Sequence, residues 1–333
     1  MAVTTLTEIR KKFRKLTRTP DPNQISDADI DQYVNTFVLY DIPSELRFFN
    51  LRTNLTFYTQ PNIDLYETNT TNPLDPLYNF KNKYIAVHEP VFIAGIQAYY
   101  TQFRNSFYAY FPQTNYINDF DFFADGTTGP FTGTLPSVPM LQNYVTISTL
   151  NAAGTAMILV DFPQDNVTGI LAQPNDSGNP LGTINYITGA FSLTFPAATV
   201  AQTPIIFETI PYQAGKSYAM LYYDDQFIIR PVPDKVYSVQ IEVDVRPTEL
   251  LSTSQSPDLE QWWQMIAIGA AIKLFQDRMD MDSVNLLFPE FQRQMRMALR
   301  TTLTQQVNMR TQTIFTQNQW GIGGWGFWGQ WPY

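Results

Sequence analysis

The side chains that most often carry catalysis are scarce in this sequence of 333 residues. It contains no cysteine and a single histidine, His88, which lies in an apolar segment just before Pro90. Cysteine nucleophiles, disulfides and histidine-rich zinc sites are therefore excluded. A lone histidine in such a segment is more typical of a structural residue than of a catalytic base. We expect neither a cofactor nor a metal, and we do not predict an enzyme.

Two groups of aspartates are the remaining candidates for chemistry. Three lie between residues 119 and 125, without the spacing or the distant glutamate of an EF-hand loop. Three more, between residues 277 and 282, follow a predicted helix and are typical of a solvated turn. A pair of carboxylates that hydrolyses sugars stays an open alternative, because only the geometry of the folded chain identifies such a pair.

Aromatic side chains give a sharper signal, in residues 320–333. Four of the six tryptophans lie there, interleaved with glycine. Glycine-rich backbone has high conformational entropy and large aromatics gain most when buried, so the segment needs a surface that receives it. That surface belongs to the same subunit, to a second copy or to another protein, and we predict an arm that crosses to a neighbouring subunit. The candidate contact residues are Trp320, Trp325, Phe327, Trp328, Trp331 and Tyr333.

The charge of the chain is distributed unevenly. The net charge is −9, yet residues 1–18 carry six basic side chains and a single acidic one, so the remainder is more acidic than the whole. An acidic body argues against a nucleic-acid clamp, which needs cations to neutralise phosphates. A negatively charged body suits the wall of a passage that DNA traverses without binding, because like charges repel. A net charge that keeps the protein soluble explains the same composition.

Helical spacing of apolar residues appears near both ends. Leu6, Ile9, Phe13 and Leu16 predict an amphipathic helix with basic residues opposite, and Ser26 is the predicted N-cap of a second helix. The first is either a surface helix or an arm that docks on an acidic partner, with Ile9 and Phe13 as candidate contact residues.

Two long helices are predicted towards the other end of the chain. The first runs from Pro257 to about Asp280, and residues 269–271 (Gly-Ala-Ala) allow a neighbour to approach it closely. The second starts near Pro289, since proline suits the first turn. Its arginines, Arg293, Arg296 and Arg300, are either exposed and inert or pair with an acidic neighbour.

The middle of the chain has the alternation and turns of β-structure, apart from an aromatic stretch at 99–111 whose spacing predicts a helix. Short strands at regular spacing within 126–211 predict a sandwich or barrel inserted into the first domain. The expected fold class is α+β: helices packed on an antiparallel β core, an inserted all-β domain and extended terminal arms. The predicted domains are 1–20 (a basic N-terminal helix or arm), 21–125 with 212–317 (the core), 126–211 (the insertion) and 318–333 (a Gly/Trp-rich arm).

Several segments resemble one family of viral proteins. They are residues 6–10, 26–35, 90–95, 227–234 (FIIRPVPD), 246–247, 257–259 and 263–275, with 182–190 similar to a β-module that recurs in phage virion proteins. In this order they resemble head-to-tail connector (adaptor) and tail-tube ring proteins of tailed bacteriophages. The resemblance implies a closed ring of about twelve copies around a DNA channel below the portal.

These observations lead to a structural hypothesis. The chain is expected to form a homomeric ring in the phage neck or tail, to link the portal to the tail, and to line a passage through which DNA moves transiently. Its partners would be itself, the portal and other neck or tail proteins. Synthesis in the bacterial cytoplasm without membrane insertion is expected, because no apolar run approaches the roughly 20 residues that cross a bilayer. The alternatives are a carbohydrate-binding or depolymerase tail component, disfavoured by the absence of long repeats, and a surface adhesin, disfavoured by the absence of a signal peptide.

Overall fold

The computed structural model of the protein describes residues 4–45, 49–113, 116–118 and 122–306. Helices account for 29% of the residues and strands for 30%, and the strands form two curled sheets. The fold class is therefore α+β, as predicted. The chain forms two compact units. The helical unit comprises described residues of 1–53, 82–87 and 243–333, and the sheet unit comprises those of 54–81 and 88–242.

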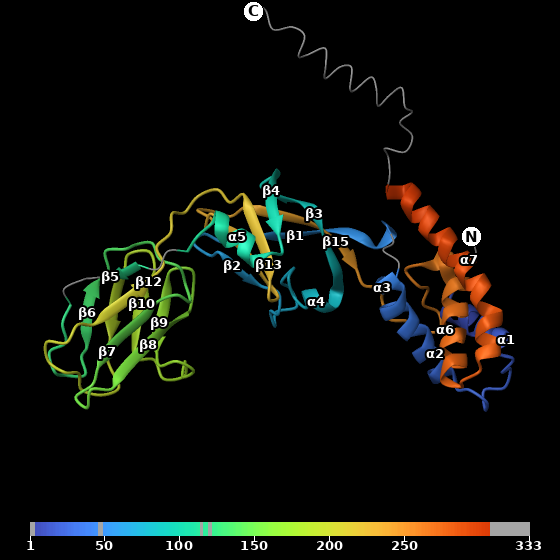
Figure 1. Cartoon of the computed structure of the whole chain (residues 1–333), viewed down its shortest axis with the longest axis horizontal. Helices are drawn as coiled ribbons and strands as arrows, with labels where there is room; N and C mark the ends of the chain where they lie inside the picture. The colour runs from blue at the N-terminus through green and yellow to red at the C-terminus, as the bar shows by residue number, and fades with distance from the viewer. Residues whose placement is uncertain (1–3, 46–48, 114–115, 119–121, 307–333) are drawn as a thin grey trace, which may run out of the picture. The chain divides into compact units, whose positions relative to one another are not determined.

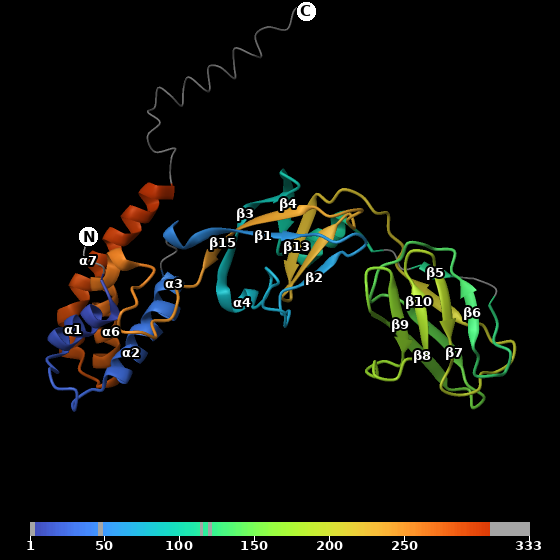
Figure 2. The same cartoon turned by 180° about the vertical axis from the view of Figure 1, so that it is seen from behind.

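The helical unit is built around one buried helix. Helix α6 (Trp263–Asp277) is apolar over most of its circumference and is buried along nearly its whole length, as helices of this composition are. It contacts α1 (Leu6–Thr17), α2 (Asp27–Thr36) and α7 (Met281–Gln306), which lie around it in both views of Figures 1 and 2. A π-helical turn (Phe37–Asp41), α3 (Ile42–Glu45) and short 3-10 turns (Phe49–Leu51 and Glu260–Trp262) complete the unit.

The start of α2 follows the predicted capping chemistry. The Ser26 hydroxyl accepts a hydrogen bond from the Asp29 backbone N–H at 3.1 Å, and the Asp29 carboxylate accepts one from the Ser26 backbone N–H at 3.3 Å. This reciprocal arrangement satisfies two backbone donors that a helix start leaves open.

Helix α7 starts eight residues earlier than predicted. It begins at Met281, where Asp280 accepts hydrogen bonds from the Ser283 backbone N–H (3.1 Å) and hydroxyl (2.6 Å). Pro289, the expected start, lies inside the helix. Val284 precedes it and is buried against Ile268 and other residues of α6, so packing outweighs the hydrogen bond that proline removes.

A seven-stranded sheet dominates one part of the sheet unit. Its strand order is β1-β15-β3-β4-β13-β14-β2, so β1 and β2 are its edges. The strands are β1 (Arg52–Tyr58), β2 (Leu65–Glu67), β3 (Tyr84–Ile93), β4 (Ile96–Thr101), β13 (Ala219–Tyr223), β14 (Gln226–Arg230) and β15 (Ser238–Val245). The short helix α4 (Phe80–Lys83) precedes β3.

One pair in this sheet departs from the antiparallel pattern. Strands β4 and β13 run parallel, with Tyr99 opposite Ala219. Parallel neighbours need a long crossover, and here the crossover carries α5 (Arg104–Tyr110) and the whole inserted β-domain. The helix predicted over 99–111 is therefore wrong in its first part, since pairing with β13 holds Tyr99 and Tyr100 in a strand.

The inserted domain is an antiparallel sheet of eight strands. Its order is β5-β12-β7-β8-β9-β10-β11-β6, and its core is rich in phenylalanine, including Phe131, Phe191 and Phe207. The strands are β5 (Tyr116–Asn118), β6 (Phe131–Thr134), β7 (Thr146–Leu150), β8 (Ala156–Pro163), β9 (Thr168–Ala172), β10 (Gly182–Asn185), β11 (Ala190–Leu193) and β12 (Ile206–Thr209). Because β5 pairs with β12, this sheet starts before the predicted boundary at residue 126.

Candidate assembly surfaces

Three of the aspartates singled out in the sequence, Asp125, Asp277 and Asp280, have structural partners. Asp125 accepts hydrogen bonds from the backbone N–H and hydroxyl of Thr127, and Asp277 accepts one from the Tyr33 hydroxyl at 2.8 Å. Asp119 and Asp121 lie outside the described residues. Within the described ranges, no cluster of three or more His, Asp or Glu side chains is arranged to hold a metal ion. No helix in this same part of the chain is long and apolar enough to span a membrane.

Two arginines on the basic side of α1 are paired within its own unit. The Arg10 guanidinium binds Asp31 and, at 3.1 Å, Asp27, while Arg14 binds Asp27 at 2.6 Å. The hydrogen bond from Arg14 is the main cause that lowers the pKa of Asp27. The acidic partner of this helix is therefore α2 of the same chain.

The apolar side of α1 is equally occupied. Ile9 and Phe13 are fully buried in the core that surrounds α6, and the Phe13 ring stacks on Tyr33 with centroids 6.5 Å apart. Both were predicted as contacts to a partner in an N-terminal arm. In the structure they are core residues of their own unit and present no surface to another molecule.

The predicted arginines of α7 lie on its exposed side. Arg293 forms an ion pair with Glu290 on the same helix at 2.7 Å, and this hydrogen bonding lowers the pKa of Glu290 to about 2. Arg296 and Arg300 are exposed as well. The three arginines are interleaved with apolar side chains on the same exposed arc of the helix.

Those apolar side chains form the first candidate surface, which we call the α7 surface. It consists of Met279, Met281, Leu286, Phe288, Met297 and Leu299. Leu286 is 75% exposed and Met279, in the turn before α7, is 87% exposed. Ala298, on the opposite side of the helix, is fully buried. Exposed apolar side chains gathered on one helix and its preceding turn, here interspersed with arginines, mark a candidate surface for meeting another molecule.

A second candidate, the α5 surface, lies in the sheet unit. It consists of Tyr99, Phe103, Tyr110, Tyr218 and Tyr223, and Phe103 is 75% exposed. The Tyr99 and Tyr110 rings meet edge to face at 5.8 Å. Tyr99 lies in β4, Tyr110 in α5 and Tyr223 in β13, while Phe103 and Tyr218 come directly before α5 and β13.

An arginine and a buried ring order the α5 surface. The Arg104 guanidinium lies 5.7 Å from the Tyr108 ring centre and 5.6 Å from that of Tyr223, within cation–π range of both. Phe107 anchors α5 to the sheet through buried contacts with Ala219 and Leu221. The sequence pattern predicted the aromatic stretch but not this surface, because spacing alone does not say which rings a strand turns outward.

The third feature is a pocket between the two edge strands of the seven-stranded sheet, which we call the seam pocket. It has a volume of about 350 Å³. Its lining residues are Phe57, Tyr58, Gln60, Ile63, Leu65, Tyr66, Glu67, Thr70, Asp75, Pro76 and Leu77. The rings of Phe57 on β1 and Tyr66 on β2 are 5.6 Å apart, so the two edges meet through side chains. Burial raises the pKa of Tyr66, whose hydroxyl donates to the Ile63 carbonyl at 2.9 Å.

Comparison with known proteins adds no assignment. The chain matches no model of a protein family, and no curated protein matches it. The exposed surfaces and the resemblance of the sequence segments are therefore what indicates a function.

The predicted contact residues from Trp320 to Tyr333 lie outside the described residues. Trp320, Trp325, Phe327, Trp328, Trp331 and Tyr333 therefore stay predictions. Of the predicted contact residues that the structure describes, Ile9 and Phe13 are core residues, whereas Arg293, Arg296 and Arg300 lie on the exposed side of α7.

Proposed function

We propose that this protein is a structural virion component that assembles into a closed homomeric ring in the neck or tail of a tailed bacteriophage. The ring links portal to tail and surrounds the path of the DNA. The observation that carries the proposal is that, among the described residues, each unit has an exposed apolar surface of its own. The α7 surface belongs to the helical unit and the α5 surface to the sheet unit.

The two surfaces differ in chemistry, as a ring contact requires. Ring closure uses a heterologous interface, in which one surface of a subunit meets a different surface of the next. The α7 surface is rich in methionine and leucine, and the α5 surface is rich in tyrosine. Methionine sulfur and arginine both pack favourably on aromatic rings, so the two surfaces suit each other.

The charges support a passage rather than a clamp for DNA. The net charge of the chain is −9. The basic N-terminal stretch is its most cationic part, yet Arg10 and Arg14 are neutralised by Asp27 and Asp31. Nucleic-acid clamps keep such cations free for phosphates.

The decisive experiment is to measure the mass and image the particles of the purified full-length protein across a range of concentrations, with and without portal protein. We expect closed rings, with about twelve copies if the resemblance extends to copy number. A protein that stays monomeric at every concentration and does not associate with a portal would overturn the proposal.

The α5 surface also supports a second function, binding of carbohydrate by a tail component. Exposed Tyr99, Tyr110 and Tyr218 offer flat rings on which sugar rings stack. Titration of capsule polysaccharide against the protein tests this function. Saturable quenching of tyrosine and tryptophan fluorescence that Tyr110→Ala abolishes would favour binding, and release of reducing ends would add depolymerase activity.

A further inference from the structure

We propose that the segment Trp320–Trp331 of one copy binds in the seam pocket of a second copy, with an indole ring entering between β1 and β2. The inference rests on the self-assembly proposed above and names a contact that this assembly would use.

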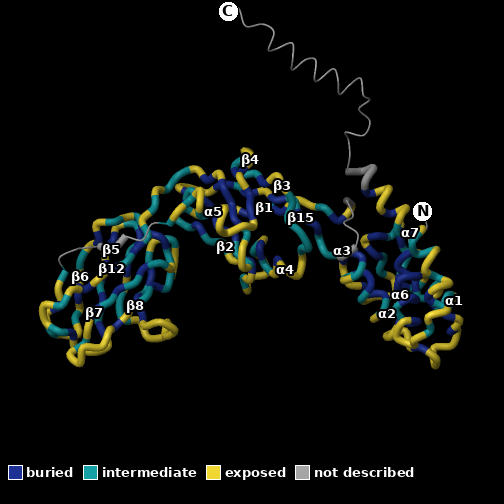
Figure 3. Tube along the Cα trace, in the orientation of Figure 1, coloured by how far each residue is buried: buried dark blue, intermediate teal, exposed yellow. Residues whose placement is uncertain are grey.

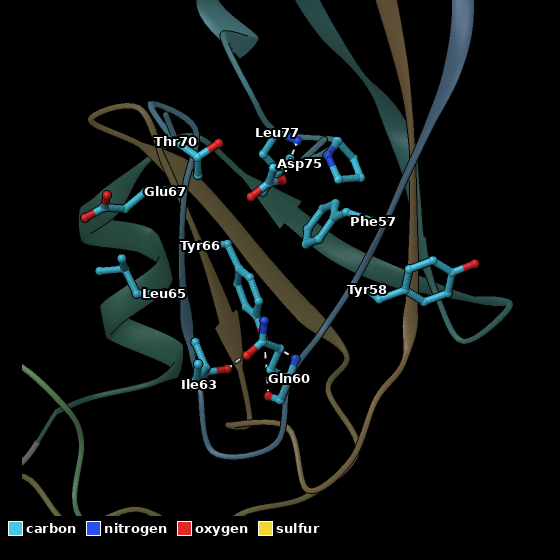
Figure 4. A pocket seen from close by; sticks show the side chains of 11 residues that line it. Phe57, Tyr58, Gln60, Ile63, Leu65, Tyr66, Glu67, Thr70, Asp75 and Leu77 are labelled. Atoms are coloured by element: carbon cyan, nitrogen blue, oxygen red, sulfur yellow. Dashed lines mark hydrogen bonds between the residues drawn. The ribbon is translucent and has the colours of Figure 1, made fainter. Parts of the chain in front are cut away.

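The pocket has the shape and lining to receive an aromatic ring. Its apolar walls include the rings of Phe57 and Tyr66 and the side chain of Leu77, and Figure 4 shows Thr70 and Asp75 beside them. A volume of about 350 Å³ suits one large side chain rather than a folded element. Aromatic side chains that enter such pockets contribute most of the binding free energy in many interfaces.

Three polar groups of the pocket can accept a hydrogen bond, which matches an indole. Among the residues that the structure describes, the buried Thr70 hydroxyl oxygen has no hydrogen-bond partner. The Asp75 carboxylate accepts only from the Leu77 backbone N–H, at 2.8 Å, and the exposed Glu67 carboxylate forms no ion pair among the described residues. An indole N–H is a donor only, so it can satisfy one of these acceptors while its ring stays apolar.

The edges of the sheet add a second reason. Strands β1 and β2 each have a neighbour on one side only. An extended segment can add backbone hydrogen bonds to such an edge while its side chains occupy adjacent pockets. In an extended chain Trp325 and Phe327 would lie on the same side, and the glycines between the aromatic residues allow the backbone to approach closely.

The length and charge of the segment fit a neighbouring copy. Residues 307–333 follow the end of α7 and, fully extended, reach about 90 Å. That reach exceeds the diameter of a compact chain of this length, whose radius of gyration is about 20 Å. Residues 311–333 contain no charged side chain, so the carboxylates of Glu67 and Asp75 do not repel them.

The absence of cysteine from the sequence allows a sharp test by disulfide trapping. Full-length Glu67→Cys, at the pocket rim, is mixed with full-length Gly326→Cys and oxidised under mild conditions. We expect a disulfide-linked dimer that forms at least tenfold faster than with Gly178→Cys in place of Glu67→Cys. Gly178 is a matched control because it is exposed and a Cβ atom there would meet no neighbour within 4 Å.

A pocket-filling variant completes the experiment. Adding Thr70→Trp to the Glu67→Cys protein should suppress the cross-link to the Gly178→Cys level at an unchanged melting temperature. If Thr70→Trp does not fold, Trp325→Ala with Trp328→Ala in the Gly326→Cys protein should give the same suppression. Equal rates for Glu67→Cys and Gly178→Cys would overturn the inference. So would trapping seen only when Glu67→Cys and Gly326→Cys are in one chain.

The same samples separate this inference from the proposed function. The mass of each protein is measured before oxidation. Rings without specific trapping would overturn the docking of the segment and leave the ring intact. Specific trapping between copies that form no ring would support the docking and count against the ring.

Discussion

Gly269 of α6 lies directly against the ring of Phe37, so closely that a Cβ atom at position 269 would overlap the ring. The Phe37 ring in turn meets Phe291 of α7 edge to face, with centroids 5.8 Å apart. Because residue 269 is a glycine, two segments can pack closely against the buried helix α6. They are the turn that follows α2, through Phe37, and helix α7, through Phe291. The predicted close approach of a neighbour is confirmed at Gly269.

Gly269→Ala should destabilise the helical unit because the added methyl group has no space beside Phe37. We expect the free energy of unfolding to fall by about 1–3 kcal/mol, as for other overpacked cores. Urea unfolding followed by circular dichroism measures this. Gly178→Ala, in open space, should change it by less than about 0.5 kcal/mol, and Phe37→Leu should relieve part of the cost of Gly269→Ala. Equal effects at positions 178 and 269 would contradict this account.

Arg10→Ala should weaken the docking of α1 on α2. The side chain is largely buried, and its loss leaves Asp31 without its main partner. A charged hydrogen-bonded contact of this kind contributes about 1.5–3 kcal/mol. Lys11→Ala is the matched control, since the Lys11–Glu8 pair is exposed and is worth about 0.5 kcal/mol or less. The melting temperatures of both variants test this role of Arg10. A larger decrease for Lys11→Ala than for Arg10→Ala would refute it.

Replacing Arg230 by Met should be among the most damaging changes in the sheet unit. Its guanidinium binds the Asp64 carboxylate at 2.6 Å, and both side chains are only 8% exposed. Removing one partner leaves a buried charge and costs about 3–5 kcal/mol. The double variant Asp64→Leu with Arg230→Met should recover part of that loss. Lys81→Met, which breaks an exposed pair with Asp225, is the control and should leave the melting temperature almost unchanged.

Asp161→Asn should destabilise the inserted β-domain. One carboxylate oxygen accepts from the Val145 backbone N–H at 2.9 Å, and the other accepts from the Asn143 backbone N–H and the Tyr186 hydroxyl at 2.7 and 2.8 Å. An amide NH₂ cannot accept, so at least one buried donor loses its partner at a cost of about 1–3 kcal/mol. Tryptic digestion of the domain under native conditions should be faster in the variant, and an unchanged rate would count against this role.

The same residue predicts a pH dependence. Burial is the largest cause acting on Asp161 and outweighs the hydrogen bonds that favour its ionised form, so its pKa is raised above the ordinary value of 3.8. A carboxyl group whose pKa is raised on folding contributes stability below pH 3.8, and this contribution is lost as the pH rises through the raised pKa. The stability advantage of the native protein over Asp161→Asn should therefore shrink as the pH increases through that window. Denaturant titrations at a series of pH values measure it, and an advantage that grows would be the opposite result.

Leu286→Glu should weaken assembly without unfolding the chain. The side chain is 75% exposed, so its replacement removes no core contact but places a charge on the α7 surface. We expect at least a tenfold rise in the concentration at which oligomers form, with an unchanged melting temperature. Gln173→Glu adds the same charge at an exposed position of the inserted β-domain, which contributes no residue to either candidate surface. Mass measurements on the two variants should differ, and equal assembly would exclude the α7 surface as a contact.

Local patterns in the sequence were enough to predict much of the fold. The spacing of Leu6, Ile9 and Phe13 defined α1, the Ser26 cap defined the start of α2, and the alternation of 237–245 defined β15. These features depend on a few neighbouring residues and on the period of a helix or a strand, so the sequence displays them directly. The α+β class and the inserted sheet followed from the same signals.

Tertiary structure decided what covers each apolar side. Periodicity showed that Ile9 and Phe13 face something apolar, but only the fold shows that this is α6 of the same chain rather than a partner. Likewise, packing on α6 carries α7 through Pro289, and pairing with β13 turns part of an apparent aromatic helix into strand β4. The hydrophobic effect favours burial of the apolar side of every helix and strand, whatever covers it. Which element covers it depends on contacts between residues far apart in the sequence.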